Sequence, residues 1–321
     1  MPDAPGDSAA AEETSHEQRA AIEVRALSRR FGETLALRDF DMTVFRGEVH
    51  GFLGRNGAGK TTAIRILAGL INADAGRAEI LGEGVVGGSH AVRRRVGFLV
   101  ESPAFFAHLN GRDNLWCHAM LMGGIEKSQV DASLDLFGLS AAAGRKVGGY
   151  SLGMRQRLGL AQAFLGDPEI IVLDEPAIGL DPGGVIAIRE IIQRYSAEKG
   201  TTFLISSHTL GEMERLCSRV SIIDEGALVA EGTLGDLGAT GRITVRVDNT
   251  PKALLLIEEW FDRSEPRLRS GDRIQLTIGE GDVPELVRRL VEAGLAVREV
   301  STGPAVLEDL FLDLVGSGGV S

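Results

Sequence analysis

A short glycine-rich stretch carries the clearest candidate chemistry of this chain. Residues 54–62 read Gly-Arg-Asn-Gly-Ala-Gly-Lys-Thr-Thr, so Gly54 and Gly59 enclose four residues and precede Lys-Thr, the spacing of a phosphate-binding loop. Glycines let the backbone turn with positive φ, so that successive N–H groups converge on phosphate oxygens. We expect Lys60 to reach the β- and γ-phosphates of a nucleotide and the Thr61 hydroxyl to hold Mg²⁺. The pattern predicts these phosphate-binding residues: Gly54, Asn56, Gly57, Ala58, Gly59, Lys60, Thr61 and Thr62.

The neighbouring residues favour a ligand-binding loop over a plain glycine-rich turn. The apolar run at 49–53 predicts a strand, and Ile64 and Leu67 at helical spacing predict a helix directly after the loop. Such a helix points its positive N-terminal end at the same anion. Strand, loop and helix in this order form the context that the pattern requires.

Two adjacent carboxylates, Asp174 and Glu175, form a second candidate site. They follow four apolar residues at 170–173, which predict a buried strand, and precede Pro176. Neighbouring residues of an extended backbone point to opposite sides, so we expect the two acids to have different roles. Asp174 suits Mg²⁺ through its waters, and Glu175 suits polarising an attacking water. The alternative is a simple turn at the end of a strand.

Two further polar residues come just after expected strands. Glu101 follows the apolar run at 96–100, and His208 follows the run at 201–207. Ligands of open α/β sheets bind at the carboxyl ends of the strands. Glu101 is therefore placed to reach a metal or its water, and His208 is a catalytic candidate. An exposed loop glutamate and a capping or packed histidine are the structural alternatives.

Two other residues have a structural and a functional interpretation. Ser151 is a candidate N-cap for a helix through Leu158 and Leu165, and that segment alone favours a plain cap over an anion site. Phe31 lies in a turn between two expected strands, where it either stacks on an adenine ring or covers core residues.

The hydrophobic pattern predicts an α/β protein with two domains and a tail. The first 20 residues, rich in Ala, Asp, Glu, Pro and Ser, indicate a disordered acidic tail. A nucleotide-binding domain is expected over 21–238, with a helical lobe over about 101–166 where strand signals are absent. A small α+β accessory or dimerisation domain is expected over 242–316. The strands expected there are 243–247, 274–278 and 295–300, and the helices are 252–261, 283–293 and 305–315.

The composition of the 321 residues narrows the class of protein. Its 45 acidic and 34 basic residues give a net charge of −11, which disfavours a nucleic-acid surface. The two cysteines, Cys117 and Cys217, are far apart in sequence, which fits a reducing compartment and argues against a disulfide scaffold. No apolar run approaches the roughly 18 residues of a membrane span, so any membrane role is expected to depend on a partner.

Taken in order, the motifs resemble a known family. With the loop at 54–62, the Ser151 segment, the Asp174–Glu175 pair, the Asp181 loop and His208, residues 22–237 resemble the nucleotide-binding domain of ABC transporters. The order and spacing of the five motifs together are highly specific.

Further details look most like exporter ATPases of the bacitracin-resistance and drug-efflux type. These details are Leu152 and Met154 in the Ser151 segment, Glu-Ser-Pro after Val100, and the C-terminal extension.

The resemblance implies a fold and a set of roles. The fold is a P-loop NTPase core with an antiparallel β subdomain, an inserted helical subdomain and a small C-terminal α+β domain. Glu101 falls where the family usually has the glutamine that joins the metal site to the helical lobe. The other implied roles are adenine stacking by Phe31, Mg²⁺ binding by Thr61 and Asp174, general base catalysis by Glu175, γ-phosphate contact by His208, γ-phosphate contact across a head-to-tail dimer by Ser151 and Gly153, and a dimer contact at Asp181.

Two positions depart from the family pattern. The common Leu-Ser-Gly-Gly-Gln signature is Tyr-Ser-Leu-Gly-Met at 150–154, so the first glycine and the glutamine are lost. The Ser151 hydroxyl and the N–H of Gly153 remain, which keeps anion binding physically possible. Glu101 in place of glutamine adds a negative charge near the metal.

The resemblance implies an ATP-binding and ATP-hydrolysing subunit, using Mg²⁺, that powers a separate transmembrane permease and exports a drug, antibiotic or other amphiphile. A second nucleotide-binding subunit is required, and a homodimer is expected. The chain is then cytoplasmic and peripheral at the inner face of the cell membrane, with permease contacts expected around 101–112. The alternative is a soluble ABC-type ATPase acting on the ribosome or DNA, which the acidic composition disfavours. A regulatory module without turnover is disfavoured by Lys60, Asp174, Glu175 and His208.

Overall fold

The computed structural model describes residues 19–86, 92, 94–101, 103–239, 242–261, 264, 266–268, 272–278 and 280–302. They fall into two compact units that divide between Glu231 and Gly232, ahead of the boundary expected near 238–241. Apart from residues 19 and 20, the expected acidic tail lies outside the described residues, and so does the helix expected over 305–315.

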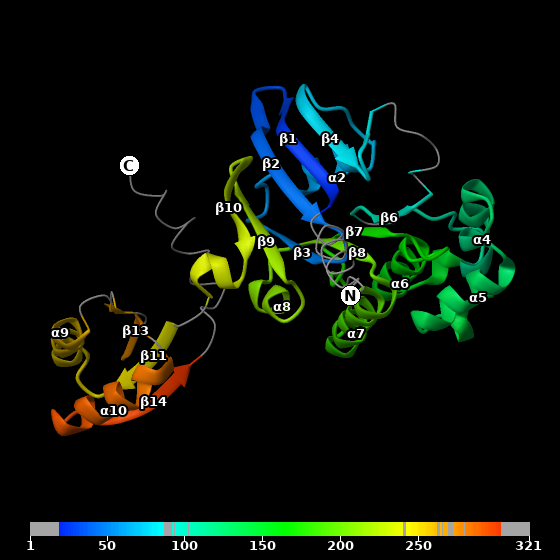
Figure 1. Cartoon of the computed structure of the whole chain (residues 1–321). Helices are drawn as coiled ribbons and strands as arrows, with labels where there is room; N and C mark the ends of the chain where they lie inside the picture. Colours follow the sequence, from blue (N-terminus) through cyan, green and yellow to red (C-terminus); the bar gives the residue numbers. More distant parts are fainter. Residues whose placement is uncertain are drawn as a thin grey trace, which may run out of the picture. The chain divides into compact units, whose positions relative to one another are not determined.

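A mostly parallel six-stranded sheet forms the centre of the first unit (Figure 1). Its strands, in spatial order, are β10 (Ala227–Thr233), β9 (Arg219–Asp224), β3 (Val49–Leu53), β8 (Thr202–Ser207), β7 (Ile170–Asp174) and β6 (Val96–Leu99). Strand β3 pairs in parallel with both β8 and β9, and β7 pairs in parallel with both β6 and β8. Every residue of β3, β7 and β8 is buried, which explains the apolar run of β7 and the apolar centre of β8.

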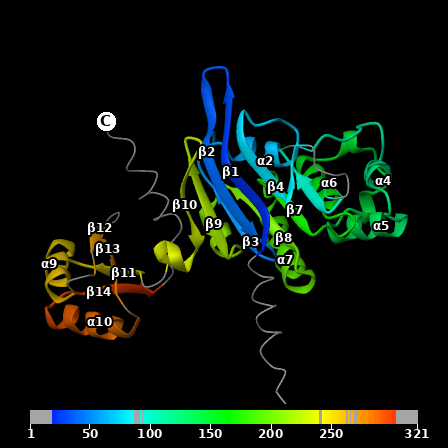
Figure 2. The same cartoon turned by 45° about the horizontal axis from the view of Figure 1, so that its top comes forward.

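A second, antiparallel sheet packs beside the helix that follows the glycine-rich loop. Its order is β2 (Thr34–Phe45), β1 (Ala20–Phe31), β4 (Ala75–Ile80) and β5 (Glu83–Gly84). Helix α2 (Lys60–Leu67) contributes Ile64 to a core shared with Phe40 of this sheet and Val172 of the central sheet. In Figure 2 the strands β1, β2 and β4 lie together beside α2. Both sheets therefore fix the position of α2 and of the loop before it.

The helical lobe contains α4 (Gly111–Met122), α5 (Lys127–Leu136) and α6 (Leu152–Ala163), with short 3-10 turns at Ser140–Ala142 and Val147–Gly149. In both views α4 and α5 lie at the end of the unit away from β9 (Figures 1 and 2). The lobe is anchored to the central sheet where a Cβ on Gly159 of α6 would lie 2.7 Å from Leu99. Helices α7 (Pro182–Lys199) and α8 (Leu210–Glu214) complete the unit.

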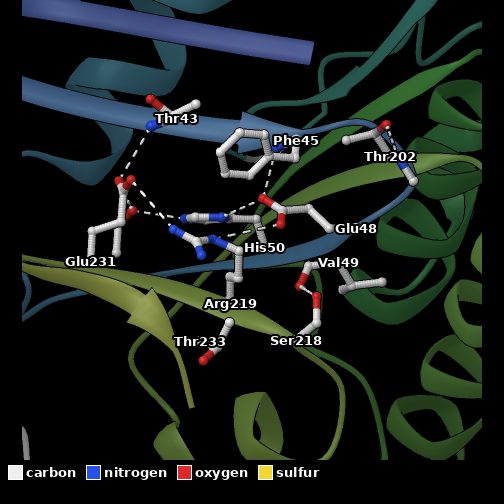
Figure 3. Close-up of polar contacts among 12 residues, drawn as sticks. Thr43, Phe45, Glu48, Val49, His50, Thr202, Ser218, Arg219, Glu231 and Thr233 are labelled. Carbon is white, nitrogen blue, oxygen red and sulfur yellow. Dashed lines mark hydrogen bonds and ion pairs between the residues drawn. The ribbon is translucent and has the colours of Figure 1, made fainter. Parts of the chain in front are cut away.

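A buried polar network ties strands of this unit together away from the glycine-rich loop (Figure 3). His50 on β3 is fully buried; its Nδ1 lies 2.9 Å from Glu48 Oε1 and its Nε2 lies 2.7 Å from Ser221 Oγ on β9. Ser221 donates to Glu231 Oε2 at 2.8 Å. Arg219 lies between the two glutamates, 3.7 Å from Glu48 and 3.9 Å from Glu231. The network joins β3, β9 and β10 through side chains as well as through backbone hydrogen bonds.

The second unit has its own sheet and core. The sheet order is β12 (Arg267–Leu268), β13 (Arg273–Thr277), β11 (Arg242–Val247) and β14 (Val297–Thr302), and its pairings are antiparallel. Helices α9 (Thr250–Trp260) and α10 (Val283–Glu292) bury Ile257 and Leu286 against it. The expected last strand, 295–300, is found two residues later, because Leu295 instead packs into the core after α10. Short turns precede β11 and α10, at Gly235–Ala239 and Glu280–Asp282.

Candidate active site

The glycine-rich loop joins β3 to α2, the two elements expected on either side of it. A Cβ on Gly54 would lie 2.5 Å from the Ile223 carbonyl oxygen on β9, so only glycine fits there. Gly59 has φ of 112°, and a Cβ on it would lie 2.5 Å from the Ala36 carbonyl oxygen. Close packing on two strands thus fixes the loop, and α2 begins at Lys60 with its N-terminal N–H groups at the loop.

A cavity of about 560 Å³ opens beside this loop, within the usual size range of small-molecule sites. Its lining residues are Thr34, Leu35, Ala36, Arg38, Arg55, Asn56, Gly57, Gly59, Lys60, Thr61, Thr62, Glu175 and Glu225. Two of the expected phosphate-binding residues, Gly54 and Ala58, are not in this lining, because Gly54 packs against Ile223 and Ala58 is buried. Phosphate binding by these two residues stays a prediction.

Lys60 presents a buried cation at the cavity. Its Nζ donates to the carbonyl oxygens of Gly54 at 2.6 Å and Arg55 at 3.2 Å, and lies 3.8 Å from Glu175 Oε1. Burial lowers the pKa of Lys60, while the Glu175 and Asp174 carboxylates oppose that effect. The ammonium group is thus poised between loop carbonyls and a carboxylate.

Asp174 and Thr61 bring oxygen donors together from two elements. The Thr61 hydroxyl donates to Asp174 Oδ2 at 2.9 Å, and Ser206 on β8 donates to Asp174 Oδ1 at 2.5 Å. A hydroxyl and a carboxylate are the hard oxygen ligands that suit Mg²⁺. Ser206 was not singled out from the sequence, because Thr202 and Ser207 of the same buried strand also carry hydroxyls and no local pattern distinguishes Ser206 from them.

Glu175 and His208 meet although they come from different strand ends. His208 Nδ1 lies 2.8 Å from Glu175 Oε2, and the Glu175 N–H donates to Ser206 Oγ at 2.9 Å. Gln156 of α6 donates to the Pro176 carbonyl oxygen at 3.1 Å, which links the helical lobe to this turn. The arrangement gives Glu175 a fixed backbone and leaves its carboxylate between Lys60 and His208.

Three glutamates just past the ends of central strands share a left-handed backbone conformation. Glu101 after β6, Glu175 after β7 and Glu225 after β9 have φ of 52°, 49° and 46°. For a residue with a Cβ, this conformation costs about 1 kcal/mol or more. Glu175 and Glu225 line the cavity, whereas Glu101 does not.

Glu101 is paired with a cation of the same unit. Its carboxylate accepts a hydrogen bond from the guanidinium of Arg65, which lies one helical turn after Thr61 on α2. The negative charge of Glu101 is therefore compensated within the chain. No local sequence pattern marks Arg65 as the partner of Glu101.

Ser151, Gly153 and Asp181 lie outside the cavity lining. Ser151 caps α6, accepting from the Met154 N–H at 3.2 Å, as the capping interpretation expects. A Cβ on Gly153 would lie 2.9 Å from the Gly179 carbonyl oxygen, and Arg157 donates to Asp181 at 3.1 Å. The start of α6 is thus packed on the loop that follows Glu175.

Phe31 ends β1 and is 43% exposed. It is not part of the cavity lining, but its partner across the hairpin, Thr34, is. The backbone of Phe31 is therefore adjacent to the start of β2, which forms one edge of the cavity.

Other candidate sites are not supported by the described residues. Among them, no group of three or more His, Cys, Asp or Glu side chains could hold a metal ion. Cys117 and Cys217 are free, and burial raises the pKa of the Cys217 thiol. Within the same part of the chain, no helix has the length and apolar character to span a membrane.

The sequence of the chain is similar to those of known ATP-binding proteins. Residues 37–178 match the family model described as ABC transporter. The bacitracin transport ATP-binding protein BcrA of Bacillus licheniformis is 37% identical over 93% of this chain and 98% of its own length. The daunorubicin resistance ATP-binding protein DrrA3 of Streptomyces coeruleorubidus is 38% identical over 92% of this chain and 96% of its own length.

Solved structures of ATP-binding cassettes also match this chain. An ATP-binding subunit of an ABC transporter matches with a TM-score of 0.63 at 32% identity, over 68% of this chain and 91% of its own. A dimeric ATP-binding cassette in a post-hydrolysis state, bound to ADP and Pi, has the same fold, with a TM-score of 0.61 at 21% identity over 66% of this chain and 98% of its own. These likenesses confirm the fold class expected from the sequence.

Proposed function

The chain belongs to the ABC transporter family of ATP-binding proteins, and on that premise we propose that it hydrolyses ATP to power a separate membrane permease. The observation that carries this proposal is the convergence of Lys60, Glu175 and the hydrogen-bonded Thr61–Asp174 pair at one cavity. Each of these residues comes from the loop or strand end that its motif predicts.

ATP binding is assigned to the loop and to Phe31. The N–H groups of the loop and the start of α2 point at the phosphates, and Lys60 adds a positive charge for the β- and γ-phosphates. The Phe31 ring provides an apolar face for the adenine base. Thr61 and Asp174 would hold Mg²⁺, which would neutralise charge on the phosphate oxygens.

Hydrolysis is assigned to Glu175 and His208. Glu175 accepts a proton from the attacking water while the water oxygen bonds to the γ-phosphorus and the bond to the bridging oxygen breaks, releasing ADP. The hydrogen bond from His208, at 2.8 Å, holds the Glu175 carboxylate in position, and His208 contacts the γ-phosphate. Lys60 stabilises the charge on the phosphate oxygens.

A second copy of the chain is proposed to complete the site. Ser151 and Gly153 would contact the γ-phosphate bound by the other subunit, with Asp181 near the contact. Because the Ser151 hydroxyl already accepts from an N–H, its own hydrogen remains available to donate to an anion. The altered signature thus retains both of the donors that an oxyanion needs.

The names of the relatives support a proposal for the permease, the location and the cargo. Their names concern bacitracin transport and daunorubicin resistance, so we propose export of a drug, antibiotic or other amphiphile. The helical lobe around 101–112 would contact the permease and hold the chain at the cytoplasmic face of the membrane.

Two experiments test the proposal. Purified protein should hydrolyse ATP in a Mg²⁺-dependent manner, and a tagged chain should co-purify with a polytopic membrane protein from detergent-solubilised membranes of its host. Recovery of ribosomal or DNA-associated partners alone would instead favour a non-transport ATPase. Absence of ATP hydrolysis by the chain together with its partner would contradict the enzymatic assignment.

A further inference from the structure

We propose that Arg29 and Asp74 are positioning residues for the nucleotide base. In this arrangement Asp74 holds the Arg29 guanidinium against one face of the Phe31 ring, so that the base stacks on the opposite face. The inference rests on the proposed stacking of adenine on Phe31, and it adds a specific support for that ring.

The contact between Arg29 and Phe31 is direct. The guanidinium carbon of Arg29 lies 4.8 Å from the centroid of the Phe31 ring, in the range of a cation–π interaction. The Arg29 Nε is buried without a hydrogen-bond partner, as expected for a guanidinium that lies against an aromatic ring. Phe31 nevertheless remains 43% exposed, which leaves part of its surface available to a base.

Asp74 fixes Arg29 through both of its carboxylate oxygens. Oδ1 accepts from Arg29 Nη1 at 2.6 Å, and Oδ2 accepts from the backbone N–H of Arg30 at 2.7 Å. The Asp74 N–H donates to the Ser28 carbonyl oxygen at 2.9 Å. These contacts hold the end of β1 on both sides of Arg29, so the guanidinium has little freedom to leave the ring.

The arrangement bears on base binding in two ways. A ring at the end of a hairpin loses rotamer freedom when a base stacks on it, and a ring already held on one face loses less. The base is also restricted to the face of the ring opposite Arg29, at the end of the hairpin where Thr34, the strand partner of Phe31, lines the cavity. Arg29 and Asp74 therefore act on base affinity without touching the phosphates.

The distinguishing test compares two ligands. Mg²⁺–ATP uses both the base and the phosphates, whereas Mg²⁺–tripolyphosphate uses only the phosphate loop. Dissociation constants for both should be measured calorimetrically for the full chain and for Phe31→Ala, Arg29→Ala, Arg29→Lys and Asp74→Asn. Arg25→Ala is the matched control, because Arg25 is also on β1 and pairs with a carboxylate, Glu23, at 2.8 Å.

We expect Arg29→Ala to weaken Mg²⁺–ATP binding threefold to tenfold and to leave Mg²⁺–tripolyphosphate binding unchanged. Arg29→Lys should retain part of the affinity, Asp74→Asn should show a smaller loss than Arg29→Ala, and Arg25→Ala should match the unmodified chain. In hydrolysis assays Arg29→Ala should raise KM for ATP with kcat unchanged.

The outcomes separate this inference from the proposed function. If Phe31→Ala weakens ATP binding and Arg29→Ala does not, the positioning role of Arg29 is wrong, whereas the proposed stacking of the base on Phe31 is retained. Equal losses for ATP and tripolyphosphate in Arg29→Ala would show a general distortion of the site, and would also overturn the inference. If Phe31→Ala has no effect on ATP binding, the stacking role itself fails, and the inference fails with it.

Discussion

His208 Nδ1 lies 2.8 Å from Glu175 Oε2, although the two residues follow different strands. Strands β7 and β8 are parallel neighbours, so the residues just past their carboxyl ends are adjacent in space. This contact gives Glu175 a partner on one oxygen, while Lys60 lies 3.8 Å from the other.

Replacement of Glu175 by glutamine should separate binding from hydrolysis. Glu175→Gln preserves the side-chain shape but removes the proton acceptor, so the hydrolysis rate should fall by about 10²-fold or more. ATP binding should persist and trap a dimer, which size-exclusion chromatography with ATP would detect. Hydrolysis at the unmodified rate would contradict the role given to Glu175.

Lys60→Ala should weaken ATP binding by about 10-fold or more, because a buried cation that faces the phosphates is lost. Titration calorimetry with Mg²⁺–ATP measures the change. Thermal unfolding provides the control, since the variant must remain folded. Unchanged affinity in a folded variant would argue against the phosphate-loop assignment.

Ser206→Ala tests whether the Ser206 hydroxyl holds Asp174 and Glu175 in position. The Ser206 hydroxyl donates to Asp174 and accepts from the Glu175 N–H, so its loss leaves Asp174 Oδ1 without this donor and leaves the Glu175 N–H with the Ser206 carbonyl oxygen at 3.2 Å as its acceptor. We expect a higher Mg²⁺ concentration for half-maximal hydrolysis and a stability loss of about 1–3 kcal/mol. Ser196→Ala is the control, because Ser196 donates only to the Gly47 carbonyl oxygen in a part-buried contact. Equal Mg²⁺ requirements in both variants would contradict the role of Ser206 in positioning Asp174 for Mg²⁺ binding.

The buried network in Figure 3 predicts a purely structural effect. Ser221→Ala would leave His50 Nε2 and Glu231 Oε2 without their shared partner, at a cost of about 1–3 kcal/mol in the free energy of unfolding. Ser218→Ala, which removes a long 3.4 Å hydrogen bond to Val49, should cost less. Urea denaturation measures both. A larger loss for Ser218→Ala would contradict the importance of the network.

Glu169 predicts a pH dependence of stability. Arg95 donates two hydrogen bonds to its carboxylate, at 2.5 and 2.7 Å, and these lower the pKa of Glu169 below the ordinary value of 4.5. A lowered folded-state pKa means that the stabilisation is present above the unfolded-state pKa and is lost as pH falls through the folded-state value. As the pH falls below the ordinary glutamate value of 4.5, the melting temperature of Glu169→Gln should therefore fall less than that of the unmodified chain. Parallel curves for the two proteins would contradict this assignment.

The phosphate loop and the two acids could be predicted from the sequence because their chemistry is local. Residues 54–62 are contiguous, and Asp174 and Glu175 end one apolar strand. Their approach to Thr61 and His208 followed from the general rule that sites form at the carboxyl ends of parallel strands.

Contacts that depend on strand order and rotamers could not be predicted. Arg65 and Glu101, or Arg29 and Asp74, are far apart in the chain, and no local pattern marks them as pairs. His50 stood in an apolar strand, but its partner Ser221 became visible only once β3 and β9 were seen to be neighbours.

The left-handed conformation shared by Glu101, Glu175 and Glu225 lowers the stability of the folded chain, and at Glu175 this cost accompanies a residue that hydrolysis is proposed to need. Glycine would relieve the backbone strain at each position, and asparagine would relieve part of it, because both residues tolerate positive φ better than glutamate. A directed-evolution campaign that selects only for heat resistance would therefore favour such replacements. At Glu175 the same replacement would remove the proposed proton acceptor, so selection for heat resistance must be paired with selection for activity.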